Sequence, residues 1–482
     1  MAIDPLCCSS AVALAAKIRA REVSSEDVVA AHVVQIRRTN HALNAMVRDR
    51  FDDALAEARD ADRRLARGER DLPPLFGVPC SIKECFGVVG MPQTAGLVSR
   101  KGYVVTEDAT AVRRVREAGA IPLGVTNTSE LCMWMESSNR VYGRTGSAFD
   151  ASRTAGGSSG GEGAIVGAAG APFGLGSDIG GSIRMPAFFN GVFGHKPSGG
   201  LVPSTGQYPA PHGDALRYLT TGPITRRAED LMPILRLLAG PDGHDAGCRP
   251  MTLHDPAGVA IDALDVLDVR ERIVMPVDRS LLDAQDRAAH ALAGLGARVR
   301  PTRLPRLGKG LAIWAAKLEQ SGGPTFEEIL GDGRELALGR ELARWALGRS
   351  PFTLPALGLA AIERGTKHLG STTRKMLDEA KTLAREVDDA LGDRGVMLFP
   401  SHQRPAPRHG WALVPPLGWG YTAIFNVLEL PVTQVPLGLD RRGVPLGVQV
   451  VAKHGNDHLT IAVALALEAA LGGWSPPARW AA

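Results

Sequence analysis

The sequence predicts an α/β protein with a large mixed, mostly parallel sheet surrounded by helices. From Gly77 onward, short apolar runs typical of strands alternate with helical segments, the order that wraps helices around such a sheet. The 44% hydrophobic and 22% charged residues are ordinary for a globular protein. Neither an internal repeat nor a long linker interrupts the 482 residues, so we expect one domain.

The predicted elements follow one another in a regular order. Residues 1–70 form N-terminal helices: Ser24 is placed to cap one of them, and alternating charges mark another. A core over 71–240 then alternates strands and helices, and 395–482 completes it. The predicted strands are 76–83, 121–126, 171–176, 396–399, 432–435 and 446–451, and the predicted helices are 51–66, 109–118, 161–169 and 457–471.

Two glycine-rich serine sites lie between Thr154 and Pro186. They read GGSSGG at 156–161 and GSDIGGS at 176–182. Glycine lets another group approach the main chain closely. A serine in such a turn can be exposed, with backbone N–H groups directed at a bound carbonyl, and acyl transfer needs both features.

Other functions of these glycines stay open from the residues alone. They can form simple tight turns. A phosphate loop is disfavoured because no Lys-Ser or Lys-Thr follows, and Ile179 interrupts a dinucleotide fingerprint. A nucleophile elbow, G-x-S-x-G, fits twice. It would need a catalytic histidine, and nothing singles one out among His195, His212, His402 and His409.

The predicted strand 76–83 ends in Lys83. Pro79 indicates either an edge strand or an irregular first residue. A lysine at a strand end usually reaches water. If Lys83 is buried instead, desolvation favours its neutral amine, which can serve as a general base.

Together, GVPCSIKE, GGSSGG and GSDIGGSIR resemble, in order and spacing, the amidase signature family of serine hydrolases. Further runs resemble its fatty-acid amide hydrolase branch, among them 118–124, 185–191, 194–198 and 430–449. The likeness spans nearly the whole chain and is weakest between about 250 and 393. It implies one amidase signature domain over 1–482, with the catalytic residues in the signature core 71–240.

The resemblance also assigns catalytic roles. It implies a Ser–cis-Ser–Lys triad with Ser182 as nucleophile, Ser158 as proton relay and Lys83 as general base. The Gly157–Ser158 peptide bond is expected to be cis. The N–H groups of Ile179, Gly180, Gly181 and Ser182 would form the oxyanion hole.

Three further residues are expected to support this site. We expect Asp178 and Arg184 to form an ion pair that shapes the nucleophile loop, with a plain surface salt bridge as the alternative. Ser159 is expected to hydrogen-bond Lys83, with a simple turn hydroxyl as the alternative.

Soft apolar residues follow at 132–135. Met133, Trp134 and Met135 either line the acyl pocket or pack in the core. Our candidate substrate-binding residues are Cys132, Met133 and Met135. The segment 303–376, which we call the cap segment, contains an apolar and basic run at 341–357 that Pro351 and Pro355 interrupt. We expect it to cover the acyl channel and to touch lipid, with packed surface helices as the alternative.

The sequence therefore predicts an amide hydrolase acting through an acyl-enzyme on linear fatty-acyl or aryl-acyl amides, with esters and carbamates open to the same relay. One alternative is the amidase subunit of a glutamyl-tRNA amidotransferase. The other is a non-catalytic binding homologue.

Composition limits the partners and the cellular location. The net charge of +4 gives no reason to expect nucleic acid. The six cysteines show no zinc spacing, so we expect no metal and no cofactor, and reduced thiols fit a cytoplasmic location. The apolar run 11–16 is too short for a signal peptide, and the N-terminal anchor of some relatives is not expected. A small-molecule amide, peripheral lipid and a homodimer are the partner hypotheses.

Overall fold

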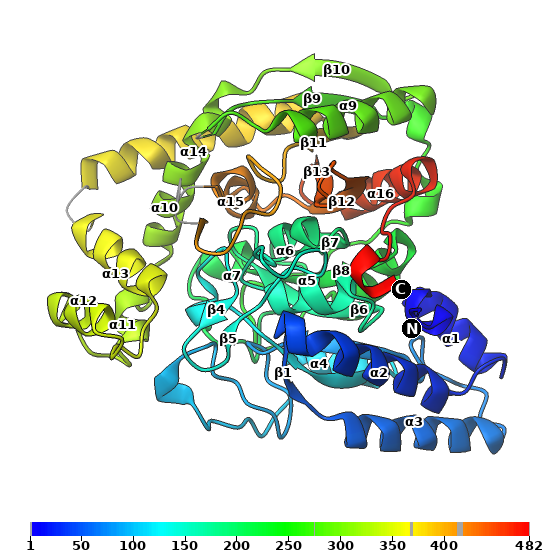
Figure 1. Cartoon of the computed structure of the whole chain (residues 1–482). Coiled ribbons are helices and arrows are strands. Elements are labelled where there is room, and N and C mark those ends of the chain that lie inside the picture. Colours follow the sequence, from blue (N-terminus) through cyan, green and yellow to red (C-terminus); the bar gives the residue numbers. More distant parts are fainter. Residues whose placement is uncertain (1, 274, 367–369, 412–417, 482) are drawn as a thin grey trace.

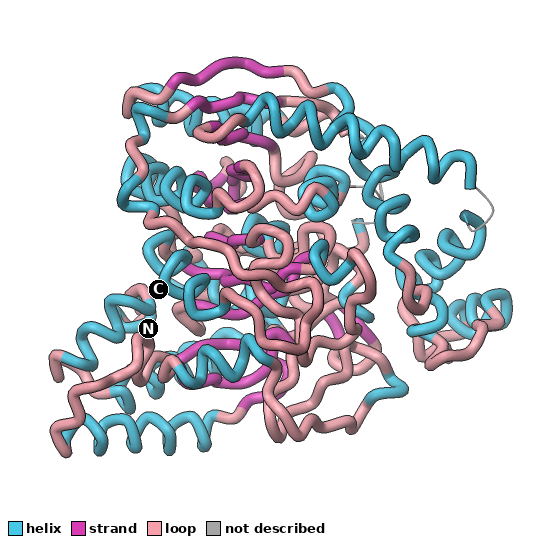
Figure 2. Tube along the Cα trace, turned by 180° about the vertical axis from the view of Figure 1, so that it is seen from behind, coloured by secondary structure: helices cyan, strands magenta, loops and turns pink. Residues whose placement is uncertain are grey.

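A computed structural model describes residues 2–273, 275–366, 370–411 and 418–481 (Figure 1). An 11-stranded mixed sheet runs through it in the order β1-β3-β2-β6-β8-β7-β12-β13-β11-β9-β10. Figure 2 shows the strands in the interior with helices around them. The predicted class, a large mixed sheet surrounded by helices, is confirmed.

The strands of the large sheet are β1 (Met46–Asp49), β2 (Pro79–Lys83), β3 (Ile121–Thr126), β6 (Phe173–Asp178), β7 (Phe193–Lys196), β8 (Thr220–Thr225), β9 (Asp265–Val269), β10 (Arg298–Thr302), β11 (Gly395–Phe399), β12 (Val432–Leu439) and β13 (Pro445–Ala452). A small separate ribbon pairs β4 (Ser138–Asn139) with β5 (Gly143–Arg144).

The α-helices are α1 (Ala11–Arg19), α2 (Ser25–Leu43), α3 (Phe51–Ala66), α4 (Thr110–Glu117), α5 (Gly160–Gly167), α6 (Arg184–Phe189), α7 (Ala215–Tyr218), α8 (Leu231–Leu238), α9 (Arg279–Gly294), α10 (Gly310–Ser321), α11 (Phe326–Leu330), α12 (Leu338–Ala346), α13 (Leu354–Thr366), α14 (Gly370–Leu391), α15 (Gly420–Val427), α16 (Asp457–Leu471) and α17 (Ala478–Ala481). Short 3₁₀ turns are η1 (Pro5–Cys8), η2 (Val98–Arg100), η3 (Glu130–Cys132), η4 (Ala228–Asp230), η5 (Pro256–Gly258), η6 (Ile261–Ala263) and η7 (Pro305–Lys309).

Parallel pairing occurs in two blocks, β3-β2-β6 and β11-β9-β10. Antiparallel pairs join the blocks through β8, β7, β12 and β13, so the antiparallel share is larger than the alternation of helices and strands alone indicates. Because β2 and β6 are parallel neighbours, Lys83 and Asp178 come to the same edge of the sheet. Ligands of α/β sheets bind at such carboxyl ends.

Several predicted elements agree closely with the structure. The strand 121–126 and the helix 457–471 have the predicted bounds, whereas β6 begins and ends two residues later than predicted. Pro79 is the first residue of an inner strand, so the irregular start, and not an edge, explains it. Ser24 caps α2 by accepting a hydrogen bond from the Asp27 N–H.

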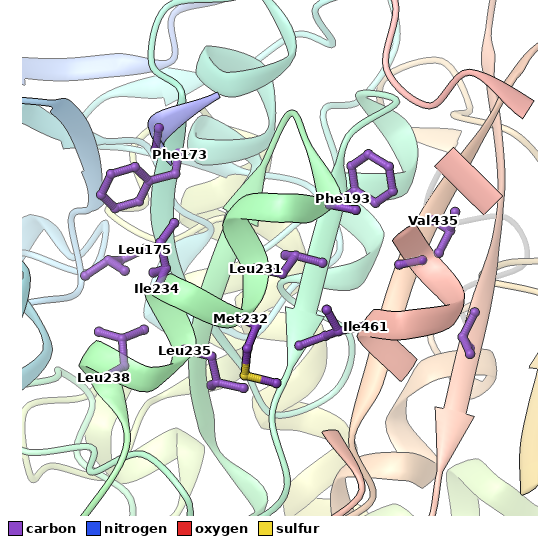
Figure 3. Close-up of a cluster of buried hydrophobic side chains, with 14 of the residues drawn as sticks. Phe173, Leu175, Phe193, Leu231, Met232, Ile234, Leu235, Leu238, Val435 and Ile461 are labelled. Atoms are coloured by element: carbon purple, nitrogen blue, oxygen red, sulfur yellow. The ribbon is translucent and has the colours of Figure 1, made fainter. Parts of the chain in front are cut away.

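Helix α8 illustrates how helices are held against the sheet. Leu231, Ile234, Leu235 and Leu238 recur with the three- and four-residue spacing that puts apolar side chains on one helix face. These side chains are buried in one cluster with Phe173 and Leu175 of β6 (Figure 3). The strand that carries the candidate site is therefore backed by close packing.

The cap segment projects to one side of the sheet, where Figure 1 shows α11, α12 and α13. Helices α12 and α13 form the predicted helix–turn–helix around the two prolines. Buried apolar side chains join the segment to loops of the core: Leu97, Leu131, Leu330, Ala356 and Ala360. Among the described residues, every helix is too short or too polar to cross a membrane.

Candidate active site

Lys83 ends β2 as a fully buried side chain. Its Nζ donates to Ser158 Oγ at 2.7 Å and to Ser177 Oγ at 3.0 Å. The Gly157–Ser158 peptide bond is cis. A Cβ on Gly157 would overlap the main-chain oxygen of Trp134, so only glycine lets the Ser158 loop lie this close to its neighbour.

The second hydroxyl that reaches Lys83 belongs to Ser177, and the expected contact from Ser159 is corrected. Ser159 Oγ donates instead to the Ser177 carbonyl at 3.4 Å, and its N–H donates to the Ser182 carbonyl at 3.2 Å. Ser177 lies on β6, beside β2 in the sheet, so strand pairing brings it to Lys83. Ser159 therefore joins two loops and supports the site indirectly.

A buried carboxyl group on α5 contacts the strands next to the site. Glu162 accepts hydrogen bonds from Ser81 Oγ at 2.5 Å and Thr126 Oγ1 at 2.6 Å. Burial raises the pKa of Glu162 to about 7, against those hydrogen bonds and the charge of Lys83. Its two hydroxyl partners lie on β2 and β3, so α5 is fixed to these strands.

Asp178 and Arg184 form a fully buried ion pair at 2.9 Å, so the surface alternative is wrong. The Asp178 carboxylate also accepts from the N–H groups of Gly181 at 2.7 Å and Ile183 at 3.0 Å. Burial alone would raise the pKa of Asp178, but Arg184 and these hydrogen bonds hold it well below its usual range. The pair shapes the nucleophile loop, which we define as residues 178–184.

Four backbone N–H groups were expected to form the oxyanion hole. Within the described part of the chain, those of Ile179, Gly180 and Ser182 donate to no group. The Gly181 N–H is the exception, because Asp178 Oδ1 already accepts its hydrogen bond. Three of the four N–H groups are thus open in this structure, and Gly181 shapes the loop.

Ser182 is 8% exposed and lies on the loop next to Ser158. In the described chain, its hydroxyl makes no hydrogen bond to Ser158 Oγ or to another group. The contact between Ser159 and the Ser182 carbonyl holds the two serine loops together. Lys83 and Ser158 are hydrogen-bonded to each other, whereas Ser182 is linked to them through the main-chain contact between its loop and the Ser158 loop.

Three of the four histidines considered for a nucleophile elbow have other partners. His195 contacts Thr433 Oγ1 and Asp457 Oδ1. His402 contacts the Arg404 carbonyl, and His409 contacts Glu136. The hydroxyl partner of Ser158 is Lys83, so the geometry disfavours the elbow.

The candidate substrate-binding residues divide into two groups. Met135 is buried with Met185 in a small cluster against Trp134 and Trp419, whose rings meet edge to face at 5.6 Å. Cys132 and Met133 are half-buried.

Cys132 contacts Thr128 Oγ1 at 3.3 Å and has a left-handed backbone. A hydrogen bond from Cys85 and the charge of Lys83 lower the pKa of the Cys132 thiol, although burial opposes them. Cys132 thus lies beside the lysine, whereas Met135 packs with the tryptophans.

Sequence reasoning missed the residues that hold the nucleophile loop from elsewhere in the chain. Thr422 Oγ1 donates to the Gly180 carbonyl at 2.6 Å, and Asn426 Nδ2 donates to the Asp178 carbonyl at 2.8 Å. Trp314 Nε1 donates to the Ile179 carbonyl at 2.7 Å. No local motif marks these residues, because they reach the loop only through the tertiary fold.

A buried lysine–serine pair thus lies at the carboxyl end of parallel strands, beside a second serine whose loop has open backbone donors within the described chain. Among the described residues, no group of three or more His, Cys, Asp or Glu could hold a metal ion. The family model "Amidase" matches residues 27–461. The chain therefore belongs to the amidase signature family and is an amide-hydrolysing enzyme.

Three relatives place the chain within this family. It is 46% identical to fatty-acid amide hydrolase 2-B of Danio rerio, over 98% of this chain and 91% of that protein. It is 32% identical to a glutamyl-tRNA(Gln) amidotransferase subunit of Acidothermus cellulolyticus, over 96% of this chain and 94% of that protein. The solved 6-aminohexanoate cyclic dimer hydrolase superposes with a TM-score of 0.81 at 26% identity, over 98% of this chain and 99% of that chain.

Proposed function

We propose that the protein hydrolyses linear amides with an apolar acyl group, and that Ser182, Ser158 and Lys83 perform the reaction. The observation that carries the proposal is the 2.7 Å contact between Lys83 Nζ and Ser158 Oγ, both buried. Within the described chain, the hydrogen-bond partners of Lys83 Nζ are two serine hydroxyls. Neither hydroxyl is a counter-ion, and the reaction we propose uses the Lys83 amine as a proton acceptor from Ser158.

The reaction begins with proton transfer through the two hydroxyls. Neutral Lys83 takes the proton of Ser158, and Ser158 takes that of Ser182 as Ser182 Oγ attacks the amide carbonyl. The tetrahedral oxyanion faces the open N–H groups of Ile179, Gly180 and Ser182. Each such donor is typically worth about 2.7–4 kcal/mol of transition-state stabilisation.

The second half of the reaction reverses the relay. Ser158 gives its proton to the leaving nitrogen as the C–N bond breaks, and it recovers a proton from Lys83. Water then loses a proton through Ser158 to Lys83 and attacks the acyl-enzyme. The acid is released and Ser182 recovers its hydroxyl.

The acyl group determines the substrate class. Cys132, Met133 and Met135 offer soft apolar surface, which suits a fatty-acyl or aryl-acyl chain, and the main chain at Met135 lies against Gly157. The similarity to a fatty-acid amide hydrolase supports the same choice. Esters and carbamates expose an equivalent carbonyl, so we include them.

We assign the cap segment to the acyl channel and to lipid contact. Leu342 on α12 and Leu347 directly after its end are exposed, and Arg340 and Arg344 lie on the same helix. Exposed apolar residues together with cations are typical of a helix that binds a membrane surface. The single domain, the homodimer and the cytoplasmic location stay predictions.

The amidotransferase subunit is the second candidate, because the chain is also similar to such a protein. The higher identity to the fatty-acid amide hydrolase argues against it. The non-catalytic homologue is disfavoured because Lys83, Ser158 and Ser182 are all present.

Hydrolysis of anilides by the purified chain alone tests the proposal. We expect cleavage of dodecanoyl p-nitroanilide without glutamine, tRNA or a partner protein, and a slower rate on the acetyl analogue. Ser182→Ala should lose this activity. Equal rates on both anilides would contradict the apolar acyl pocket, and no cleavage without a partner would favour the amidotransferase function.

A further inference from the structure

Trp314 contacts the nucleophile loop from the cap segment. It lies on α10, more than a hundred residues from Ser182 in the sequence, and its Nε1 donates to the Ile179 carbonyl at 2.7 Å. The ring also stands beside Gly180, where an added Cβ would meet the Trp314 ring at 3.6 Å. The indole therefore contacts the peptide that joins Ile179 to Gly180 both by a hydrogen bond and by packing.

The planarity of the peptide bond makes this contact directional. In a trans peptide the carbonyl and the N–H point in opposite directions. When Trp314 fixes the Ile179 carbonyl, it fixes the Gly180 N–H on the opposite side. That N–H donates to no group in the described chain, so it is available to a substrate oxygen.

The other two open donors follow the same rule. The Asp178 carbonyl, which shares a peptide with the Ile179 N–H, accepts from Asn426 Nδ2 at 2.8 Å. The Gly181 carbonyl, which shares a peptide with the Ser182 N–H, accepts from the Met185 N–H at 2.7 Å. The direction of each open N–H is thus fixed by a hydrogen bond to the carbonyl of the preceding residue, which belongs to the same peptide.

The three fixing groups come from different parts of the fold. Asn426 is a buried residue of α15, and Met185 follows directly in α6. Trp314 alone among these three belongs to the cap segment. The Gly180 N–H is therefore the donor whose orientation depends on where α10 lies.

We propose that Trp314 is a positioning residue for the oxyanion hole, and that its indole N–H couples the seating of α10 to the direction of the Gly180 N–H. This inference rests on the proposed role of Ser182 and extends it to the cap segment. An acyl chain that seats α10 against the loop would also align the donor that stabilises the transition state. A loosened α10 would leave the same site with a misdirected donor.

Trp314→Phe tests this proposal because it keeps an aromatic ring and removes the N–H. Trp419→Phe is the matched control: the Trp419 ring lies 6.1 Å from that of Trp314, and its buried Nε1 has no acceptor among the described residues. The readout is saturation kinetics with a long-chain alkyl fluorophosphonate. Its P=O oxygen occupies the oxyanion hole in the transition state, so the maximal labelling rate reports the donors and the half-saturating concentration reports chain binding.

We expect Trp314→Phe to lower the maximal rate of Ser182 labelling about 10-fold, below the loss typical of deleting a donor outright. The half-saturating concentration should change little. In Trp419→Phe the maximal rate should stay within about twofold of wild type, because the lost N–H binds nothing.

Each outcome has one meaning. If Trp314→Phe labels at the wild-type maximal rate, or changes only the half-saturating concentration, the positioning role is wrong and the proposed function stands. If wild type does not label at Ser182, the proposed function itself fails. Should Trp314→Phe unfold, benzothienylalanine at 314 keeps the bicyclic shape without the N–H and gives the same comparison.

Discussion

In the nucleophile loop, Asp178 and Arg184 are fully buried and each makes several hydrogen bonds. In helix α12 of the cap segment, the one residue buried within the helix is Glu341, and Leu347 beyond its end is 70% exposed. The two side chains of a buried ion pair must stay in contact, because separating them leaves a charge that neither a partner nor water compensates. The nucleophile loop is thus fixed by buried polar contacts, whereas most side chains of α12 are exposed.

Two of the contacts between the cap segment and the core bear on this contrast, and the first of them reaches the nucleophile loop. Trp314 reaches the loop directly, and Glu130, in the turn before the candidate substrate residues, accepts from the N–H and hydroxyl of Thr353 at the start of α13. Variants of the loop, of the Glu130 contact and of the exposed end of α12 should therefore differ in their effects on stability.

The largest effect on stability is expected from Arg184→Met. It leaves Asp178 buried without its cation, which should lower the free energy of unfolding by about 3–5 kcal/mol. Arg298→Met removes an ion pair whose arginine is 72% exposed, so it should cost less than about 1 kcal/mol. Urea unfolding measures both, and equal losses would show that burial does not distinguish the two pairs.

A smaller, pH-dependent effect is expected from Glu130→Gln. Burial raises the pKa of Glu130 to about 7 in the folded protein, against its hydrogen bonds to Thr353. Between the ordinary carboxyl pKa and about 7, the folded state holds a proton that the unfolded state has lost, so stability falls as the pH rises through this range. The variant cannot titrate and lacks this contribution.

Unfolding at pH 5 and pH 8 measures the difference. Wild type should lose on the order of 1–3 kcal/mol more than Glu130→Gln across this range. The other buried carboxyl groups are present in both proteins, so their contributions to the pH dependence of stability cancel in the comparison. Identical pH dependence would mean that the contact between Glu130 and Thr353 does not join cap segment and core as we describe.

The smallest effect on stability is expected from Leu347→Ser, because this side chain is largely exposed. The free energy of unfolding should change by less than about 0.5 kcal/mol. Binding to vesicles of phosphatidylcholine and phosphatidylserine should nevertheless weaken. Leu439→Ser, at an exposed leucine on β12, is the control that should leave vesicle binding unchanged, and equal binding by all three proteins would remove the lipid role of α12.

Sequence reasoning located the residues of the candidate site better than the residues that support them. The family resemblance identified Lys83 and Ser158 from short motifs, because a strand end and a glycine-rich turn are local features of the sequence. The fold brings the two side chains into contact. Strand 121–126 was predicted with its bounds, since apolar runs between turns are also local. The ion pair between Asp178 and Arg184 could also be predicted from the sequence, because the two residues are only six positions apart.

Supports that depend on long-range packing were not predictable. The hydroxyl that contacts Lys83 belongs to Ser177 and not to Ser159, because β6 pairs with β2. The spacing of residues in the sequence does not reveal this strand pairing. The Gly181 N–H donates to Asp178 because the loop turns back on itself, a detail of backbone direction. Trp314 lies in the part of the chain where the family resemblance is weakest, so neither motif nor likeness marked it.

The central claim is that Lys83 activates Ser182 through Ser158. Its most direct test is labelling by a fluorophosphonate probe, with intact-mass measurement and peptide mapping, on wild type, Ser182→Ala, Ser158→Ala and Lys83→Ala. The account predicts a single adduct on Ser182 that is absent in Ser182→Ala and forms much more slowly in the other two variants. An adduct on Ser158 or Ser159 that forms equally fast without Lys83 would contradict it.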